Sequence, residues 1–338
     1  MNQYKAISWL NILLAFCLLF SSCSDDKKEV PPIENPVQVE LIRLEKQLFS
    51  WKNREEAKAF LLANPVFTKL YLDQKDSVLD EKLVDFVFDF YSNPALKDFN
   101  RYTDSSFQDM DKLKADFADM FSRIKIEFPD FKIPKIYTVV TGFRFDKDIA
   151  FSDTAIVISI DYFLGNNAPF RPNHYDYFLK RYDKPYILPM IGLALSTKYN
   201  VVKESDKTML ANMVYYGKAH YFLERVMPNL SDSLNIMYTE KELKNAQDNL
   251  PTIWGHFVER KLLYETSHRI LENYTGEAPA SNEISKECPG RIGRWLGWEI
   301  VRKYMIKNNK VSLKQLMAEP NAEKIFKASE FRPEHKKK

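Results

Sequence analysis

The chain has 338 residues, of which 45% are hydrophobic and 28% are charged, so it is long enough to bury a core without covalent cross-links. Its 49 lysines and arginines and 46 aspartates and glutamates are mixed along the sequence and leave a formal net charge of +3. No segment has the basic stripe of a nucleic-acid-binding protein, and this excludes nucleic acid as an expected partner.

The first residues have the pattern of a bacterial lipoprotein signal. Lys5 precedes an apolar run, residues 9–20, which is too short for a membrane span of roughly 20 residues but fits a secretory signal. Small residues and a cysteine follow in LFSSC, residues 19–23, a sequence that resembles a lipobox. The sequence predicts a signal peptide over residues 1–22 and a lipid-modified, palmitate-carrying Cys23. A plain signal peptide or an uncleaved anchor is the alternative.

The residues that follow Cys23 predict a tether and then a single domain. Two or three acyl chains hold a protein on a membrane permanently, so the membrane is an expected partner. Residues 23–38 are charged and rich in proline, which predicts an extended linker. We expect one domain over residues 39–330 and a basic tail over residues 331–338. The expected location is the cell envelope, at the outer membrane or the periplasmic face of the inner membrane.

The body of the chain reads as helices, then strands, then helices. Apolar alternation in residues 37–41 predicts a short first strand, and helical spacing predicts helices over residues 54–64, 80–93 and 106–128. The β-branched runs PKIYTVVTGF and TAIVISIDYFLG predict two or three strands in the middle. Beyond them the chain is predicted to be helical, with capping boxes in TEKE and SLKQ. The expected fold class is α+β, mostly α-helical, with a small central β-sheet.

The residues that could carry chemistry form no recognisable site. Cys17 leaves with the signal and Cys23 carries lipid, so only Cys288 remains, and no intrachain disulfide is expected. His256 with Glu259, and Glu265 with His268, are spaced as helical neighbours, but on one helix the two pairs point to opposite sides. We interpret them as surface ion pairs. His220 and His174 have no further ligand by spacing, and we interpret them as solvated or core-edge residues. The sequence predicts no catalytic residue, no metal ligand and no cofactor.

The stretch ECPGRIGRWLGWEIVRKYM, residues 287–305, is the most distinctive in the chain. Its glycines do not have the spacing of a phosphate-binding loop. On a helix that begins near Pro289 they would lie on roughly one side and let another helix approach closely. We therefore expect a packing helix, with arginines free for carboxylates or a partner. The candidate residues of this structural or partner-contact motif are Gly290, Arg291, Gly293, Trp295 and Trp298.

Several blocks, in this order, resemble a known family. They are ISIDYFLG, PYILPMIG, MVYYGKAHYFLERVMP, IWGHFVERKLLYET and CPGRIGRWLGWEIVRKYM, within residues 39–317. The chain resembles the gliding-motility lipoprotein family GldB of the Bacteroidota. The resemblance implies an envelope protein required for gliding, with partners among other gliding or type IX secretion envelope proteins.

The same blocks are more distantly similar to a predicted family of gluzincin-type zinc peptidases. That family has H-E-x-x-H on one helix and a glutamate ligand in an E-G-x-A-x-Y-F segment on the next. Here YYGKAHYF has Tyr216 in place of the glutamate, and residues 186–199 contain neither histidine nor glutamate. The resemblance implies a degenerate zincin-like body that has lost its metal ligands and acts by protein contacts.

Two functions of other classes stay open at this stage, together with one modification. The first is a divergent hydrolase, and the second is a lipoprotein that binds peptidoglycan or another glycan. The sequences DSV, DTA and DSL resemble an O-glycosylation signal on exported proteins of the phylum. They would place sugars on Ser77, Thr154 or Ser233.

Overall fold

The structure, a computed structural model, describes residues 29–74 and 78–333. The chain divides into two units, Met1–Pro31 and Pro32–Lys338, and the second unit contains all the helices and strands described below. Within the described residues, no helix is both long enough and apolar enough to cross a bilayer. The predicted signal peptide and the predicted lipidation site Cys23 lie outside the described residues.

Polar residues cap the helices of the N-terminal half. The side chains of Asn53, Asp80 and Asn93 each accept a hydrogen bond from a backbone amide of the first turn that follows. The helix predicted over residues 106–128 begins later, at Asp111, because a turn closed by Asp109 separates it from a helix that ends at Ser106. The elements are β1 (Leu41–Arg43), α2 (Glu45–Leu48), α3 (Arg54–Ala63), η1 (Phe67–Tyr71), α4 (Glu81–Ser92), α5 (Pro94–Ser106) and α6 (Asp111–Glu127).

A small mixed sheet follows α6 in the chain. Its strands β2 (Lys135–Val139), β3 (Ile149–Phe151) and β4 (Ala155–Ser159) join β1 in the order β1-β2-β4-β3. The strands β1, β2 and β4 are parallel, and β3 is antiparallel to β4. All five residues of β4 are buried, which explains why this strand reads as a continuous apolar run.

The rest of the chain is helical, as the sequence predicts. Both predicted capping boxes are confirmed, one between Thr239 and Glu242 and the other between Ser312 and Gln315. The α+β, mostly helical class is confirmed as well. The elements are η2 (Ile160–Phe163), α7 (Asp176–Leu179), η3 (Lys184–Tyr186), α8 (Ile187–Ser196), α9 (Met209–Val226), α10 (Asp232–Ile236), α11 (Glu240–Asp248), α12 (Leu250–Glu259), η4 (Leu262–Tyr264), α13 (His268–Thr275), α14 (Ile292–Lys307), α15 (Leu313–Ala318) and α16 (Ala322–Ser329).

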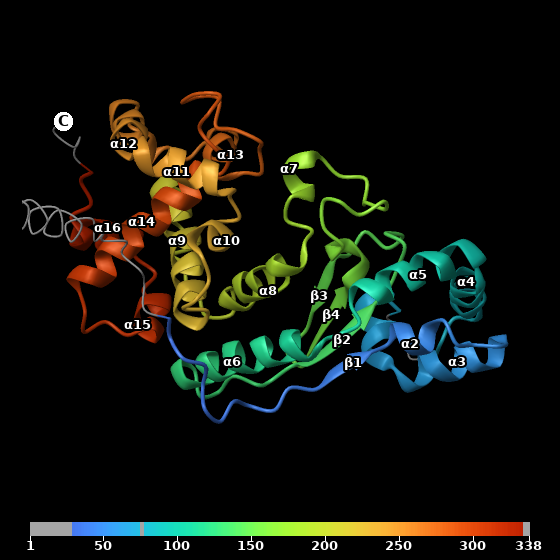
Figure 1. Ribbon diagram of the computed structural model, residues 1–338. Helices are drawn as coiled ribbons and strands as arrows, with labels where there is room; N and C mark the ends of the chain where they lie inside the picture. Colours follow the sequence, from blue (N-terminus) through green and yellow to red (C-terminus); the bar gives the residue numbers. More distant parts are fainter. Residues whose placement is uncertain (1–28, 75–77, 334–338) are drawn as a thin grey trace, which may run out of the picture. The chain divides into compact units, whose positions relative to one another are not determined.

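Helix α9 is the centre of the helical part. It packs most extensively against α14 and also contacts α6, α8, α13 and α16. Gly217, Lys218, Ala219 and His220 are four successive buried residues. Because successive residues of a helix point in directions about 100° apart, burial of four in a row means that other elements surround α9. Figure 1 shows α9 in yellow among the orange and red helices, with the sheet and α2–α5 beyond α6 and α8.

The residues before β1 are tied to α6. The backbone amide of Ile33 donates to Asp119 Oδ1, and that of Val37 donates to Ser122 Oγ, each at 2.8 Å. Val39 is already part of the core. The second half of the predicted linker is therefore bound to the domain along α6.

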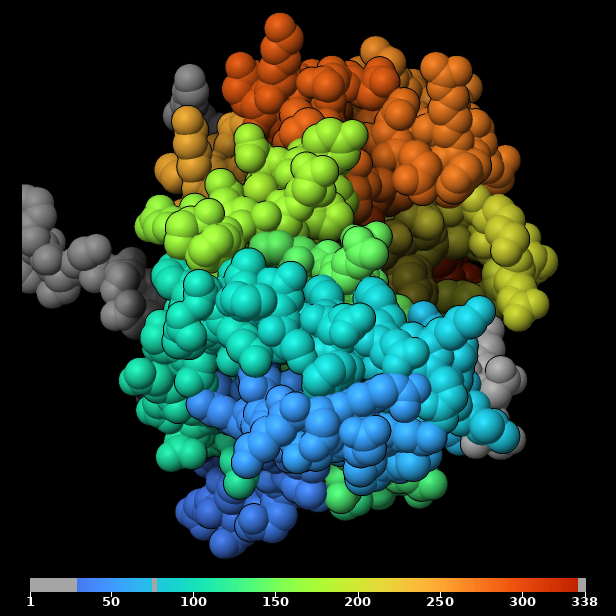
Figure 2. Space-filling model, turned by 90° about the vertical axis from the view of Figure 1, so that its right-hand side faces the viewer, coloured from blue at the N-terminus to red at the C-terminus, as the bar shows by residue number. Residues whose placement is uncertain are grey.

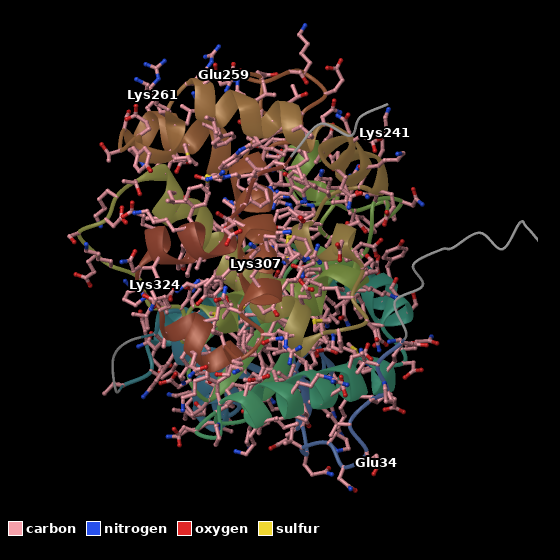
Figure 3. All side chains as sticks on the ribbon, turned by 90° about the vertical axis from the view of Figure 1, so that its left-hand side faces the viewer. Glu34, Lys241, Glu259, Lys261, Lys307 and Lys324 are labelled. Atoms are coloured by element: carbon pink, nitrogen blue, oxygen red, sulfur yellow. The ribbon has the colours of Figure 1, made fainter. Side chains whose placement is uncertain are left out.

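Surface charges are mixed, as the composition suggests. Lys307 on α14 and Lys324 on α16 are both labelled in Figure 3. Lys307 pairs with Glu330, and Lys324 pairs with Glu319. Both lysines therefore have an acidic partner close by.

Candidate functional site

The crossing of α9 and α14 brings two backbones into direct contact. A Cβ atom built on Gly217 would lie 2.2 Å from the carbonyl oxygen of Gly297. A Cβ atom on Gly297 would lie 1.8 Å from the carbonyl oxygen of Met213. Real Cβ atoms do not approach other atoms this closely, so both positions need glycine. The predicted close packing of the 287–305 segment against another helix holds at Gly297.

The other glycines of the predicted motif pack elsewhere. The helix begins at Ile292, not near Pro289, so Gly290 lies in the turn before it. A Cβ on Gly290 would lie 1.8 Å from Ala278 O, and a Cβ on Gly293 would lie 2.8 Å from Thr275 Cγ2. The expectation that the three glycines lie together on one helix face is therefore wrong. Gly290 and Gly293 pack against Ala278 and Thr275, and of the three only Gly297 packs against α9.

Both tryptophans of the motif belong to the core. Trp295 is 1% exposed and Trp298 is 0% exposed. Trp298 Nε1 donates to Glu224 Oε2 at 3.0 Å, and the Arg302 guanidinium lies 3.7 Å from the centre of the Trp298 ring. Trp298 is therefore bonded within the chain, whereas Trp295 Nε1 is buried without a hydrogen-bond partner among the described residues. The burial of both indole rings favours a structural role over direct contact with a partner.

The arginines of the motif are also engaged within the chain. Arg302 pairs with Glu224 and with Asp232, each at 2.7 Å. Arg291 is 4% exposed, and its Nη2 donates to the carbonyl oxygens of Ile236 and Met237. The sequence predicts that these arginines are free for carboxylates or for a partner, and Arg302 binds carboxylates of its own chain. Arg291 is bonded to backbone carbonyl oxygens, so the folded chain supplies acceptors to both side chains.

Glu277 is the centre of a cluster of guanidinium groups. Arg294 Nη1 lies 3.0 Å from Glu277 Oε1, and Arg291 Nε lies 3.6 Å from Glu277 Oε2. Arg181, from the segment after α7, donates through Nη2 to Glu277 Oε2. Next to them, Lys180 Nζ donates to both carboxylate oxygens of Glu242. We call these six residues the arginine cluster.

The charges in the arginine cluster shift its pKa values. Burial raises the pKa of Glu277, but the hydrogen bond from Arg181 and the charges of Arg291, Arg181 and Arg294 outweigh it and lower the pKa to about 2. Burial and the neighbouring charge of Arg181 lower the pKa of Arg291 to about 10. One carboxylate thus compensates several cations, and it stays ionised at any physiological pH.

Tyr216 lies beside this cluster, at the position where the peptidase resemblance would put a glutamate ligand. The Arg294 guanidinium lies 4.3 Å from the centre of the Tyr216 ring, which is a cation–π contact. The preceding helix α8 packs against α9 through Gly192, whose added Cβ would lie 2.5 Å from Leu223 Cδ1. A cation therefore lies against the Tyr216 ring, and α8 packs closely against α9 further along the helix.

The histidines do not converge. His220 is 3% exposed, and its Nδ1 lies 2.9 Å from Asn235 Oδ1. Burial lowers the pKa of His220 to about 3, although the hydrogen bond with Asn235 acts in the opposite direction. Our interpretation of His220 as a solvated or core-edge residue is therefore wrong. In the described part of the chain, no group of three His, Cys, Asp or Glu side chains is placed to hold a metal ion.

The predicted surface ion pairs of the other histidines are also wrong. His256 Nε2 lies 2.9 Å from the hydroxyl of Tyr274, and His268 lies 4.0 Å from Glu272. Glu265 instead accepts hydrogen bonds from the amides of the two residues that follow it. The sequence reading treated residues 256–268 as one helix, but α12 ends at Glu259 and α13 begins at His268.

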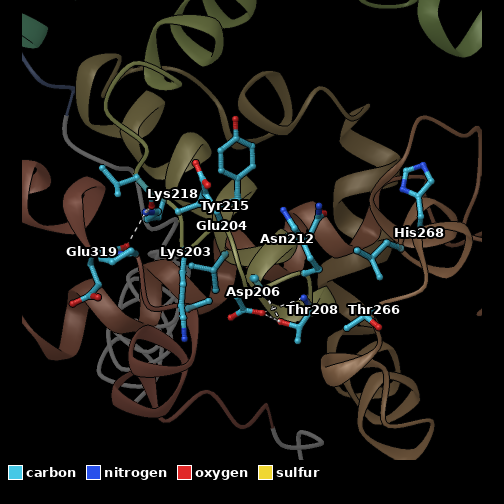
Figure 4. A pocket seen from close by; sticks show the side chains of 18 residues that line it. Lys203, Glu204, Asp206, Thr208, Asn212, Tyr215, Lys218, Thr266, His268 and Glu319 are labelled. Carbon is cyan, nitrogen blue, oxygen red and sulfur yellow. Dashed lines mark hydrogen bonds between the residues drawn. The ribbon is translucent and has the colours of Figure 1, made fainter.

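A cleft of about 600 Å³ lies beside α9 (Figure 4). Its walls come from residues 201–208, from α9 and from residues near Thr266 and Pro320. Lys218 is 2% exposed and donates to the carbonyl oxygens of Val201, Met317 and Glu319. Burial lowers the pKa of Lys218 to about 8. The sequence analysis missed this lysine, although a lysine inside the apolar stretch MVYYGKAHYF was a usable signal.

A second hollow lies between α6 and α8. It has a volume of about 440 Å³ and apolar walls that include Met110, Leu113, Leu188 and Met227. Charged residues at its rim have both signs, among them Lys112 and Asp116. Figure 2 shows a different hollow of the surface, between cyan and yellow segments.

The predicted modification sites have different surroundings. Thr154 is exposed, next to β4. Ser233 is 5% exposed and donates to Glu240, so its hydroxyl is not accessible in the folded chain. Ser77 and Cys23 lie outside the described residues.

Comparison with known families decides the assignment. The sequence profile described as gliding motility protein GldB matches residues 24–333. The chain belongs to the GldB family. The resemblance inferred from the sequence blocks is thereby confirmed, and membership implies a gliding motility lipoprotein associated with the cell envelope. No curated protein and no solved structure matches the chain.

Proposed function

We propose that this chain is a lipid-anchored component of the cell envelope that is required for gliding and acts by protein–protein contacts. The observation that carries the proposal is the family match, which begins at residue 24, directly after Cys23. Cys23 would carry the acyl chains, and the described body would be exposed to the envelope space. Its partners would be other envelope proteins of gliding or of type IX secretion.

The proposed mode of action is that of a non-catalytic, peptidase-like scaffold. In this reading, α8 and α9 correspond to the helices that carry zinc ligands in active relatives of the fold. Tyr216 and the Arg294 guanidinium stand beside each other at that position. A phenol with a pKa near 10 is a poor replacement for a carboxylate, and guanidinium groups repel a divalent cation. These features support a role in binding.

The anchoring and the gliding role can be tested together. Deletion of the gene, or Cys23→Ala, is expected to abolish spreading and, for the variant, to release the protein from the membrane fraction. Cys17→Ala, inside the predicted signal, is the matched control and should leave both properties unchanged. Normal spreading of a clean deletion strain would refute the proposal.

A second candidate is glycan or peptidoglycan binding in the cleft beside α9. Tyr215 lines this cleft, and Asn212 Oδ1 is buried there with no hydrogen-bond partner among the described residues. An aromatic ring and an amide are suitable groups for a sugar. Sedimentation with purified peptidoglycan, lost on Asn212→Ala, would favour this candidate over the first.

A divergent hydrolase is the remaining candidate. It is motivated by the peptidase-like segments alone. Metal analysis of the purified protein would decide it, because stoichiometric zinc bound through His220, His256 or His268 would contradict a non-catalytic scaffold.

A further inference from the structure

The arginine cluster has more positive than negative charge. Its cations are Lys180, Arg181, Arg291 and Arg294, and its carboxylates are Glu242 and Glu277. The Lys180–Glu242 pair is neutral as a unit, so three guanidiniums share the single charge of Glu277. The cluster therefore has a net charge of +2. Buried cations without full compensation are costly, which makes the cluster a strong attractor for an anion.

One guanidinium of the cluster has an unused donor. Arg181 is 9% exposed, and its Nε is buried with no acceptor in the described part of the chain. The Nη2 of the same group binds Glu277. Nε and Nη2 form one edge of the planar guanidinium, the edge that binds carboxylates and phosphates with two parallel hydrogen bonds. On Arg181 only one of these two donors has a protein acceptor.

Solvent reaches the same cluster. The side chains of Arg294, Lys180 and Glu277 are 16%, 22% and 28% exposed, whereas that of Arg291 is 4% exposed. A ligand can thus approach Arg294 and Lys180 from solvent. Arg181 Nε is itself buried, so a local movement of side chains must uncover it before a ligand binds there. Arg291 lies behind them and contributes charge, while its Nη2 stays bonded to Ile236 and Met237.

We propose that the arginine cluster binds a phosphate group, either free or as part of a phosphorylated headgroup. A doubly charged phosphate would neutralise the net charge of +2, whereas a single carboxylate would neutralise half of it. Its oxygens would accept from Arg181 Nε, from Arg294 and from Lys180. This site is independent of the role in gliding and of the cleft beside α9.

The test is thermal unfolding of the full-length protein in nonionic detergent at neutral pH and fixed ionic strength. Low millimolar inorganic phosphate, glycerol 3-phosphate, acetate and chloride are compared. Phosphate is expected to raise the melting temperature by roughly 2–4 °C near tenfold saturation. A larger shift with glycerol 3-phosphate would identify a lipid headgroup as the source, and a larger shift with inorganic phosphate would identify the free ion.

Variants separate this site from the general stabilising effect of phosphate on folded proteins. Arg181→Gln and Arg294→Gln should lose the phosphate-dependent shift, and the exposed Arg101→Gln control should keep it. Glu277→Gln removes the competing carboxylate and should give a larger shift than the wild type, which keeps the proposal testable if an arginine variant does not fold. Equal shifts in the wild type and Arg294→Gln, a Glu277→Gln shift no larger than that of the wild type, or acetate as effective as phosphate would overturn it.

Discussion

Alanine at Gly217 or Gly297 is expected to destabilise the folded chain strongly. The added Cβ would lie 2.2 Å from Gly297 O in the first variant and 1.8 Å from Met213 O in the second. Both obstacles are backbone atoms of packed helices, so α9 and α14 would have to separate by roughly 1–2 Å in a close-packed core. Overpacking costs about 1–3 kcal/mol and sometimes more, and we expect about 3 kcal/mol after the smaller gain in helix propensity.

Urea and thermal unfolding of the full-length protein would measure this effect. A loss of about 3 kcal/mol corresponds to a fall in melting temperature of roughly 5 °C for a domain of about 300 residues. Gly255→Ala, on α12, is the matched control, because its Cβ would meet only Glu259 Oε1, at 4.0 Å. It should be neutral or stabilising by up to about 1 kcal/mol. Gly217→Ala and Gly297→Ala as stable as this control would refute the reasoning.

Three further substitutions probe buried polar groups. Burial lowers the pKa of His220 from its ordinary value of 6.5 to about 3, so the free energy of unfolding should fall by about 2–3 kcal/mol between pH 6.5 and 4.5. His220→Gln should remove this fall. The pKa of Glu277 is lowered from 4.5 to about 2, so its ionised carboxylate adds about 3 kcal/mol to the free energy of unfolding above pH 4.5. This stabilisation is lost as the pH falls towards 2, and Glu277→Gln should lack this loss. Lys218→Met leaves three carbonyl oxygens without their donor and should cost about 2–4 kcal/mol, measured by urea unfolding at neutral pH.

Each of these predictions can fail in a definite way. An unchanged pH dependence between 6.5 and 4.5 in His220→Gln would show that another group titrates there. The same acid unfolding midpoint in Glu277→Gln and the wild type would show that Glu277 is not the ionised centre of the arginine cluster. A Lys218→Met protein as stable as the wild type would mean that water replaces the ammonium.

Local signals of the sequence were good guides to the fold. The capping boxes at Thr239 and Ser312 are confirmed because the bonds that define them join residues three apart in the chain. The strand β4 was found because all five of its residues are buried and most are apolar, and β2 was found from its β-branched and aromatic residues. Arg291 shows the limit of such reasoning, because its positive φ of 60° ends the turn and moves the start of α14 to Ile292.

The candidate site depended on contacts that spacing cannot reveal. Arg181 and Glu277 are separated by 96 positions, and Lys218 and Glu319 by 101. The residues next to Arg181 and Lys218 in the sequence give no indication of partners about 100 positions away. The family assignment succeeded for a different reason, since ordered blocks identify a family without any knowledge of which side chains meet.

The hydrogen bonds of Ile33 and Val37 to α6 limit how far the folded domain can lie from the proposed lipid anchor. If Cys23 holds the lipid, ten residues along the chain separate it from the hydrogen bond that Ile33 makes with α6. Fully extended, such a segment spans at most about 35 Å. The domain would then stay within a shallow layer next to the membrane, and a protein that binds it would have to reach into that layer.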